Sequence, residues 1–212
     1  MTLDDIFNQL SYGELVQIYA GSGDAGLTDA KDRRRIAASV YLGLVELHKR
    51  FLIKEASEEI TIVDGTLTYG LSGNDAQRIE RIIDPSGNEL TINSIGDDLA
   101  IRTPTLKSFT FPKAPSFSTV TVFYRATHPK FDESLIEMRP EDITVELPEE
   151  YLEPLLYYVA SRVLNPVGIS GTFHEGNNYT AKFEAACERL RVENIRVDSV
   201  GENTRLEDNG WV

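Results

Sequence analysis

Histidine and cysteine are the side chains of this sequence best suited to bind a metal or to act as a nucleophile. His48, His128 and His174 are far apart in the chain, and none has a second ligand at the spacing of a metal motif. The stretch "HEGNN" at 174–178 lacks the second histidine of H-E-x-x-H. A metal site assembled from distant ligands stays open as an alternative, but the sequence predicts no metal and no cofactor.

Cys187 is the single cysteine, so no disulfide can form within the chain. It shares the apolar face of a predicted helix over 176–195 with Phe183 and Leu190. A catalytic thiol needs a nearby base and an electropositive, exposed setting, and the sequence indicates neither. We therefore expect Cys187 to be buried as a small apolar side chain.

Carboxylates are concentrated in one stretch, where they outnumber the single base, Arg139. The nine acids are Asp132, Glu133, Glu137, Glu141, Asp142, Glu146, Glu149, Glu150 and Glu153. A pair of carboxylates can perform acid–base catalysis, but these are spread along a linker and a helix start. The pattern therefore predicts a solvated face with favourable charge at a helix N-terminus, and not a glycosidase-like site.

Two further motifs favour structural roles. "GSGDAG" at 21–26 lacks the Gly-Lys-Ser/Thr ending of a phosphate-binding loop and follows a helix, so it is interpreted as an interhelical loop. "KDRRR" at 31–35 is the main basic cluster, and its arginines fan out around a helix axis. We expect them to pair with an acidic surface, such as one on a neighbouring copy.

The hydrophobic pattern of the sequence is helical at first, then alternates as in strands, and then becomes helical again. These elements would position the residues described above. A helix capped by Thr2 is expected first, then a second short helix capped by Ser11 and a long helix over about 28–54. The apolar face of the long helix comprises Ile36, Val40, Leu44, Leu47 and Phe51. Five or six short strands are expected between 59 and 126, with a hairpin loop at 85–88 and an exit linker at 127–131.

Helical periodicity returns in "LPEEYLEPLLYYVASRVLNP" at 147–166. Pro148 is expected to start a short turn, and Pro154 to lie in the first turn of the helix, where a missing N–H has no cost. Pro166 is expected to end that helix. The sequence thus predicts an α+β protein: a bundle of about four helices from 1–57 and 127–196, a small antiparallel β module inserted at 58–126, and an extended C-terminal tail at 197–212.

The net charge of −13 disfavours tight nucleic-acid binding, because an acidic chain repels phosphate. The N-terminal sequence "MTLDDIFNQL" is unlike a signal peptide, and no apolar run is long enough to span a bilayer. No catalytic constellation emerges, so the sequence favours a structural or interaction role over an enzyme.

Several short patterns, in this order of elements, carry a resemblance to a known family. They are "YLGLVELHKRFLIKEASEEITI", "VTVFYRATHPKF", "ITVELPEEYLEPLLYYVASRVLNP" and "GNNYTAKFEAACERLRVEN". Over about residues 10–195 the chain resembles the head-to-tail adaptor (connector) proteins of tailed bacteriophages, especially those of podophages.

The resemblance implies a structural virion protein that forms a homo-oligomeric ring, commonly a dodecamer, beneath the portal. The implied partners are the portal protein on one side and tail or nozzle proteins on the other, with DNA passing through the lumen during ejection. The implied location is the virion neck, with the host cytoplasm during assembly. A C-terminal segment that grips the portal is also implied.

The polar, aperiodic end of the chain suits that last implication, since a segment unable to bury itself can fold on a partner. Our candidate portal-binding residues are Val200, Leu206, Trp211 and Val212, with Trp211 as the aromatic anchor. An alternative is a carbohydrate- or receptor-binding module that uses the aromatic residues of the β insert: Tyr69, Phe109, Phe111 and Phe117. An enzyme would require a compact pocket with convergent carboxylates or histidines.

Overall fold

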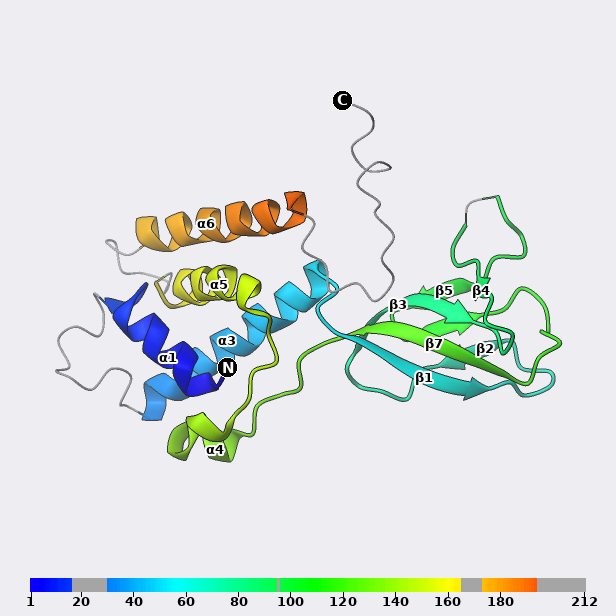
Figure 1. Cartoon of the computed structure of the whole chain (residues 1–212), viewed down its shortest axis with the longest axis horizontal. Helices are drawn as coiled ribbons and strands as arrows, with labels where there is room; N and C mark the ends of the chain where they lie inside the picture. The colour runs from blue at the N-terminus through cyan, green and yellow to red at the C-terminus, as the bar shows by residue number, and fades with distance from the viewer. Residues whose placement is uncertain (17–29, 95, 165–172, 194–212) are drawn as a thin grey trace, which may run out of the picture. The chain divides into compact units, whose positions relative to one another are not determined.

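The computed structural model describes residues 1–16, 30–94, 96–164 and 173–193. The chain divides into two compact units (Figure 1). The helical unit comprises Met1–Phe51 and His128–Val212, and the β unit comprises Leu52–Thr127. The helical unit is therefore built from both ends of the chain, with the β unit inserted between them.

The helices and strands have the following bounds. The helical unit contains α1 (Leu3–Tyr12), α3 (Ala30–Arg50), α4 (Glu133–Met138), α5 (Leu152–Leu164) and α6 (Phe173–Val192), with short 3-10 turns η2 (Pro140–Asp142) and η3 (Glu149–Tyr151). The β unit contains β1 (Glu55–Thr61), β2 (Thr68–Gly70), β3 (Ala76–Ile83), β4 (Glu89–Leu90), β5 (Arg102–Thr105), β6 (Ser108–Thr110) and β7 (Thr119–Ala126).

The structure is α+β, but the expected bundle of about four helices with one small β module is wrong. The described residues contain five α-helices, and their seven strands form two antiparallel sheets. One extra helix arises because Asp132 caps the segment 133–138 through a bond from the Ser134 N–H, where a linker was expected. The expected C-terminal tail at 197–212 lies outside the described residues.

The first expected helix is present as α1, whereas most of the expected second helix, from residue 17 on, lies outside the described residues. Thr2 caps α1 in a capping box, because its hydroxyl accepts the Asp5 N–H while the Asp5 carboxylate accepts the Thr2 N–H. Ser11 does not begin a second helix. It is buried inside α1, where its hydroxyl donates to the Phe7 carbonyl at 2.7 Å, and α1 ends at Gly13.

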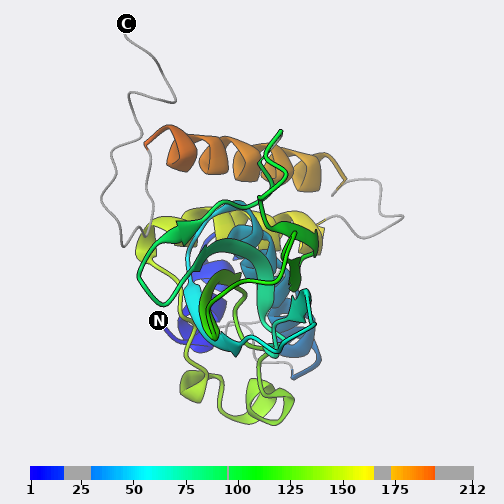
Figure 2. The same ribbon diagram turned by 90° about the vertical axis from the view of Figure 1, so that its right-hand side faces the viewer.

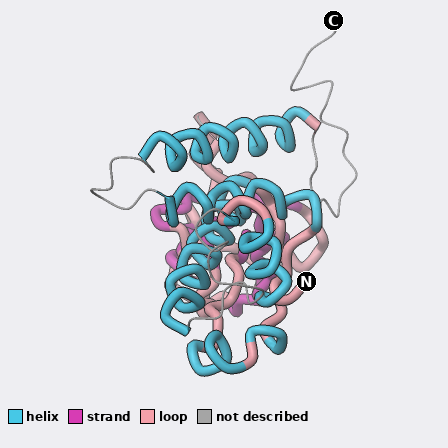
Figure 3. Tube along the Cα trace, turned by 90° about the vertical axis from the view of Figure 1, so that its left-hand side faces the viewer, coloured by secondary structure: helices cyan, strands magenta, loops and turns pink. Residues whose placement is uncertain are grey.

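The core of the helical unit forms where α3 packs against α5 and α5 packs against α6 (Figures 1 and 3). The predicted face of the long helix is confirmed, since all five of its apolar residues are buried. Gly43 lets α3 approach α5 closely: a Cβ at this position would lie 2.6 Å from Leu155 Cδ1 and 3.0 Å from Tyr158 Cδ1. A small residue is thus required at this crossing.

The proline-containing start of α5 has the predicted form. Pro148 precedes the 3-10 turn η3, and Pro154 is the third residue of α5, so its missing N–H falls among those without an intrahelical acceptor. Pro154 is itself buried, together with Leu155 and Val159. The carboxylates of Glu149 and Glu150 stay exposed in the first turn.

The β unit contains a four-stranded sheet in the order β1-β7-β3-β4 and a three-stranded sheet in the order β2-β6-β5. Figure 2 views this unit with the strands toward the reader. The hairpin predicted at 85–88 is confirmed, because β3 pairs with β4 across it. Asp84 stabilises this turn by accepting the side-chain amide and the backbone N–H of Asn88 and the backbone N–H of Ser86. These bonds, that of the Asn88 side chain first, keep the pKa of Asp84 below its ordinary value.

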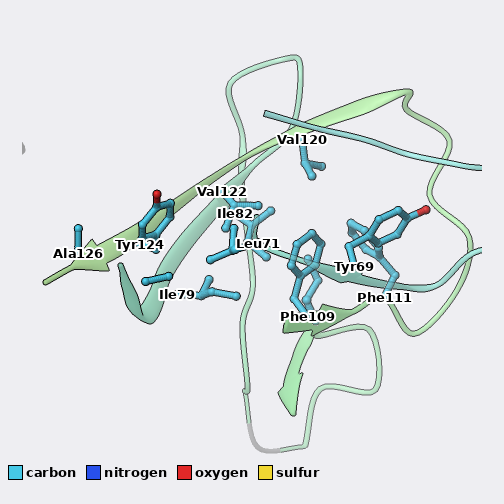
Figure 4. Close-up of a cluster of buried hydrophobic side chains, with 12 residues drawn as sticks. Tyr69, Leu71, Ile79, Ile82, Phe109, Phe111, Val120, Val122, Tyr124 and Ala126 are labelled. Carbon is cyan, nitrogen blue, oxygen red and sulfur yellow. The ribbon is translucent and has the colours of Figure 1, made fainter. Parts of the chain in front are cut away.

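Both sheets contribute to one apolar core (Figure 4). Strand β7 alternates buried and partly exposed residues, and its buried side includes Val120, Val122 and Tyr124. From the other sheet, Tyr69 and Phe109 stack with ring centroids 5.7 Å apart. The described residues of this unit contain seven strands where five or six were expected, since the three-residue β2 and β6 are too short to show alternation.

The close approach at Gly43 yields a stability prediction. We expect Gly43→Val to lower the free energy of unfolding by about 2 kcal/mol, because overpacking against Leu155 and Tyr158 outweighs the small gain in helix propensity. Urea denaturation followed by circular dichroism measures the change. Leu42→Val, at an exposed neighbouring position, is the control and should change stability by less than about 0.5 kcal/mol. Equal effects for the two variants would contradict the packing account.

Candidate functional site

The structure brings together two histidines that are distant in the sequence. His48 on α3 and His128 are both buried, and their ring centroids lie 6.3 Å apart in an edge-to-face arrangement. His48 is thus part of the buried core of the helical unit. His128 also packs against Phe131, at a centroid distance of 5.4 Å.

The hydrogen bonds of His128 identify its role. Its Nε2 accepts the backbone N–H of Glu146 at 3.2 Å, so that nitrogen carries no proton. Nδ1 then carries the proton and donates to the Pro129 carbonyl at 2.7 Å. A neutral imidazole therefore ties the backbone at 128–129 to that at 146. Among the described residues no group of three or more His, Cys, Asp or Glu could hold a metal ion.

Cys187 is buried on α6, as predicted. Burial raises the pKa of its thiol to about 11, and the nearby Arg50 cation offsets this only in part. At neutral pH the thiolate that would act as a nucleophile is therefore scarce. The geometry gives Cys187 a packing role.

Arg50 connects α3 to α6 in the same region. Its guanidinium donates to both carboxylate oxygens of Glu184, at 2.6 and 2.9 Å, and to Glu46 at 2.8 Å. It also lies 4.8 Å from the centroid of the Phe183 ring. The hydrogen bonds from Arg50 hold the pKa of the Glu184 carboxyl below its ordinary value.

The three consecutive arginines contact their own chain. Arg33 donates to the Glu137 carbonyl at 2.9 Å, and Arg34 forms an ion pair with the Glu137 carboxylate. Arg35 donates to the Val163 carbonyl at 3.2 Å, near the C-terminal end of α5. The arginines thus join α3 to α4 and α5, and the acid that Arg34 pairs with belongs to the same chain.

Carboxylates of the acidic stretch cap helices and pair with cations. Asp132 accepts both the N–H and the hydroxyl of Ser134, which keeps the pKa of Asp132 below its ordinary value. Glu153 accepts the Tyr157 hydroxyl and pairs with Arg189, and its hydrogen bond raises the pKa of Tyr157. These contacts agree with a structural use of the stretch.

The aromatic residues proposed for sugar binding lie mostly inside the β unit. Tyr69, Phe109 and Phe111 are each exposed by 8% or less, and the Tyr69 hydroxyl donates to the backbone carbonyl of Thr66 at 2.8 Å. Burial leaves these rings no open face on which a sugar could stack. Phe117 is partly buried and packs edge-on against Phe111.

Several predicted functional residues lie outside the described part of the chain. These are the tail candidates Val200, Leu206, Trp211 and Val212. The stretch at 21–26, interpreted as an interhelical loop, also lies outside the described residues. His174 belongs to α6, but its side chain is not among those described.

The helical unit has a surface pocket that the sequence interpretation missed. This α3–α4 pocket, of about 380 Å³, lies between one face of α3 and the segment 130–136. It is lined by Arg34, Ala37, Ala38, Tyr41, Lys130, Phe131, Glu133 and Ile136. The signal was available in part: Arg34, Ala37, Ala38 and Tyr41 follow the spacing of one helix face.

The pocket has the chemistry of a protein-recognition surface. Tyr41 and Phe131 meet edge to face at its wall, with ring centroids 6.0 Å apart. Apolar walls with a few charged groups at the rim are suited to hold a large side chain of a partner. A second pocket, of about 630 Å³, lies in the β unit beside Leu99, Phe111 and Phe117.

No model of a protein family matches this chain, and no curated protein matches it. Among the described residues, no helix has both the length and the apolar character needed to cross a bilayer.

The Arg50–Glu184 pair makes the stability of the helical unit depend on pH. We expect Glu184→Gln to lower the free energy of unfolding by about 1 kcal/mol at pH 7, a modest value because Glu184 is half exposed. The lowered pKa means that the stabilisation is complete above the unfolded value of about 4.3 and is lost as the pH falls through the folded pKa. Urea unfolding at pH 7, 5 and 3 measures this convergence of variant and wild type.

Glu188→Gln is the control for that measurement. Glu188 pairs with Arg191 three residues away on the exposed side of α6, so its loss should cost less than about 0.5 kcal/mol. A difference between Glu184→Gln and wild type that is unchanged at pH 3 would contradict the ion-pair explanation.

Proposed function

We propose that the chain is a structural head-to-tail adaptor of a tailed bacteriophage, a homo-oligomeric ring that joins the portal to the tail and lets DNA pass. The observation that carries the proposal is the discontinuous helical unit with its inserted β unit. The same order of elements underlies the resemblance of the sequence to the adaptor family. Copy number is proposed as twelve on that resemblance alone.

The chemistry of the described residues supports a structural role. The buried histidines, the cysteine and the arginines of α3 take part in packing and backbone contacts. Each of these side chains is thereby committed to holding the helical unit together. The proposed protein therefore acts through its surfaces and has no catalytic task.

The charge of the chain supports passage of DNA. A net charge of −13 on every copy would give a ring with an acidic surface. Such a surface attracts no phosphate, so DNA could slide past without being held. The proposed ring is located in the virion neck, and its partners are the portal on one side and tail proteins on the other.

We further propose that the C-terminal segment binds the portal through Val200, Leu206, Trp211 and Val212. A polar segment with one aromatic residue can become ordered on a partner surface and anchor there through its ring. Trp211 is the only tryptophan of the chain, so its fluorescence reports on its own environment.

Mass measurement of the purified protein tests this function directly. Native mass spectrometry of the protein alone and with portal rings should detect multiple copies bound to each portal. Trp211→Ala should weaken that association about tenfold or more, whereas Trp211→Phe should largely retain it. A chain that stays monomeric and never joins a portal would refute the proposed function.

A further inference from the structure

The helical unit carries both an apolar pocket and, elsewhere on its surface, an exposed aromatic side chain of matching character. We propose that Tyr12 of one copy occupies the α3–α4 pocket of a second copy, so that copies associate head to tail. This inference deepens the proposed function, because it assigns the surfaces through which the ring would form.

Tyr12 is an unusual surface residue. It is the last residue of α1 and is 70% exposed, and Val16 nearby is 41% exposed. Gly13 ends the helix directly after it, so Tyr12 stands at an accessible corner. Exposed tyrosines beside apolar neighbours are typical of interface anchors, since a ring buries a large area with few rotatable bonds.

The α3–α4 pocket offers a matching recess. Its volume of about 380 Å³ is lined by two small side chains, Ala37 and Ala38, and by the rings of Tyr41 and Phe131. These two rings already meet edge to face, and a third ring can join them in the same geometry. The pocket therefore suits an aromatic occupant.

Each of the two surfaces carries a charged side chain of opposite sign. Lys130 lines the pocket and forms no ion pair with any described residue, whereas Arg34 in the same pocket is neutralised by Glu137. Glu14 follows Tyr12 by two residues and likewise forms no ion pair within the described residues. Tyr12 in the pocket would thus place Glu14 where it can meet Lys130, although Glu133 at the rim reduces the net attraction.

The positions of the two surfaces make the contact a head-to-tail one. The N-terminal end of α1 is fixed beside η2, because the Leu3 N–H donates to the Ile143 carbonyl at 2.9 Å. Ten helical residues place Tyr12 about 15 Å further along the helix axis. Tyr12 and the α3–α4 pocket are different surfaces of one copy, so each copy can bind two neighbours. Contacts of this kind generate rings or filaments.

Disulfide trapping tests this contact, since Cys187 is the only native cysteine. Glu14→Cys and Lys130→Cys are combined in a Cys187→Ala background, so that Tyr12 itself is kept, and the assembled full chain, alone and on portal rings, is mildly oxidised. We expect a ladder of covalent dimers, trimers and larger species on a non-reducing gel. Glu14→Cys alone, and Glu14→Cys with Val192→Cys on α6, are matched controls that retain Tyr12 and should give no ladder.

A second measurement keeps the native cysteine and so does not depend on that background. Lys130→Glu should weaken self-association about tenfold by light scattering, and adding Glu14→Lys should restore it. A ladder together with this rescue supports the contact. Covalent dimers alone would overturn the head-to-tail geometry.

The remaining outcomes separate this inference from the proposed function. If the copies bind the portal but form no crosslink, and if Glu14→Lys does not restore self-association to Lys130→Glu, the Tyr12 contact is overturned. The proposed adaptor function would then still hold. A chain that never self-associates would overturn both.

Discussion

The packing of α3 against α5 is the constraint on which the helical unit depends. These helices come from opposite sides of the inserted β unit, so neither half of the chain can bury its apolar face alone. Gly43 permits the close crossing, and Leu155 and Val159 fill it. The insertion begins just after α3 and ends just before the segment that leads to α4. Near this junction of the chain, the buried rings of His48 and His128 meet.

Polar side chains in the helical unit reinforce that packing. His128 ties the junction to the backbone at Glu146, Arg50 joins α3 to α6, and Arg35 reaches the C-terminal end of α5. Each of these groups is of a type that can act in catalysis or binding. Because these groups are held in fixed contacts, binding of a partner would depend on exposed side chains. Tyr12 and the residues around the α3–α4 pocket are examples.

Local signals in the sequence predicted the parts of the fold that depend on local physics. The Thr2 cap, the apolar face of α3, the hairpin at 85–88 and the proline-containing start of α5 follow from residue type and spacing. The role expected for Ser11 as a helix cap was wrong, because Ser11 lies inside α1 and its hydroxyl donates back to the Phe7 carbonyl. In the same way, α4 is one and a half turns long, too short to show a period.

Non-local features could not be predicted from the sequence. Nothing in the spacing shows that β2, β5 and β6 pair apart from β1, β3 and β7, since strand partners are chosen by the shared core. The meeting of His48 with His128, and the pocket formed where Phe131 lies beside Tyr41, both require the folded chain. The tail residues proposed for portal binding remain a prediction from sequence.

Removal of the insertion tests most directly the claim that the helical unit is completed across it. Residues 52–127 would be replaced by about eight glycine and serine residues, which can span up to about 26 Å. Far-UV circular dichroism during thermal unfolding should then show a helical protein that unfolds in one cooperative transition. A variant without helical signal, or one that loses it gradually, would contradict the account.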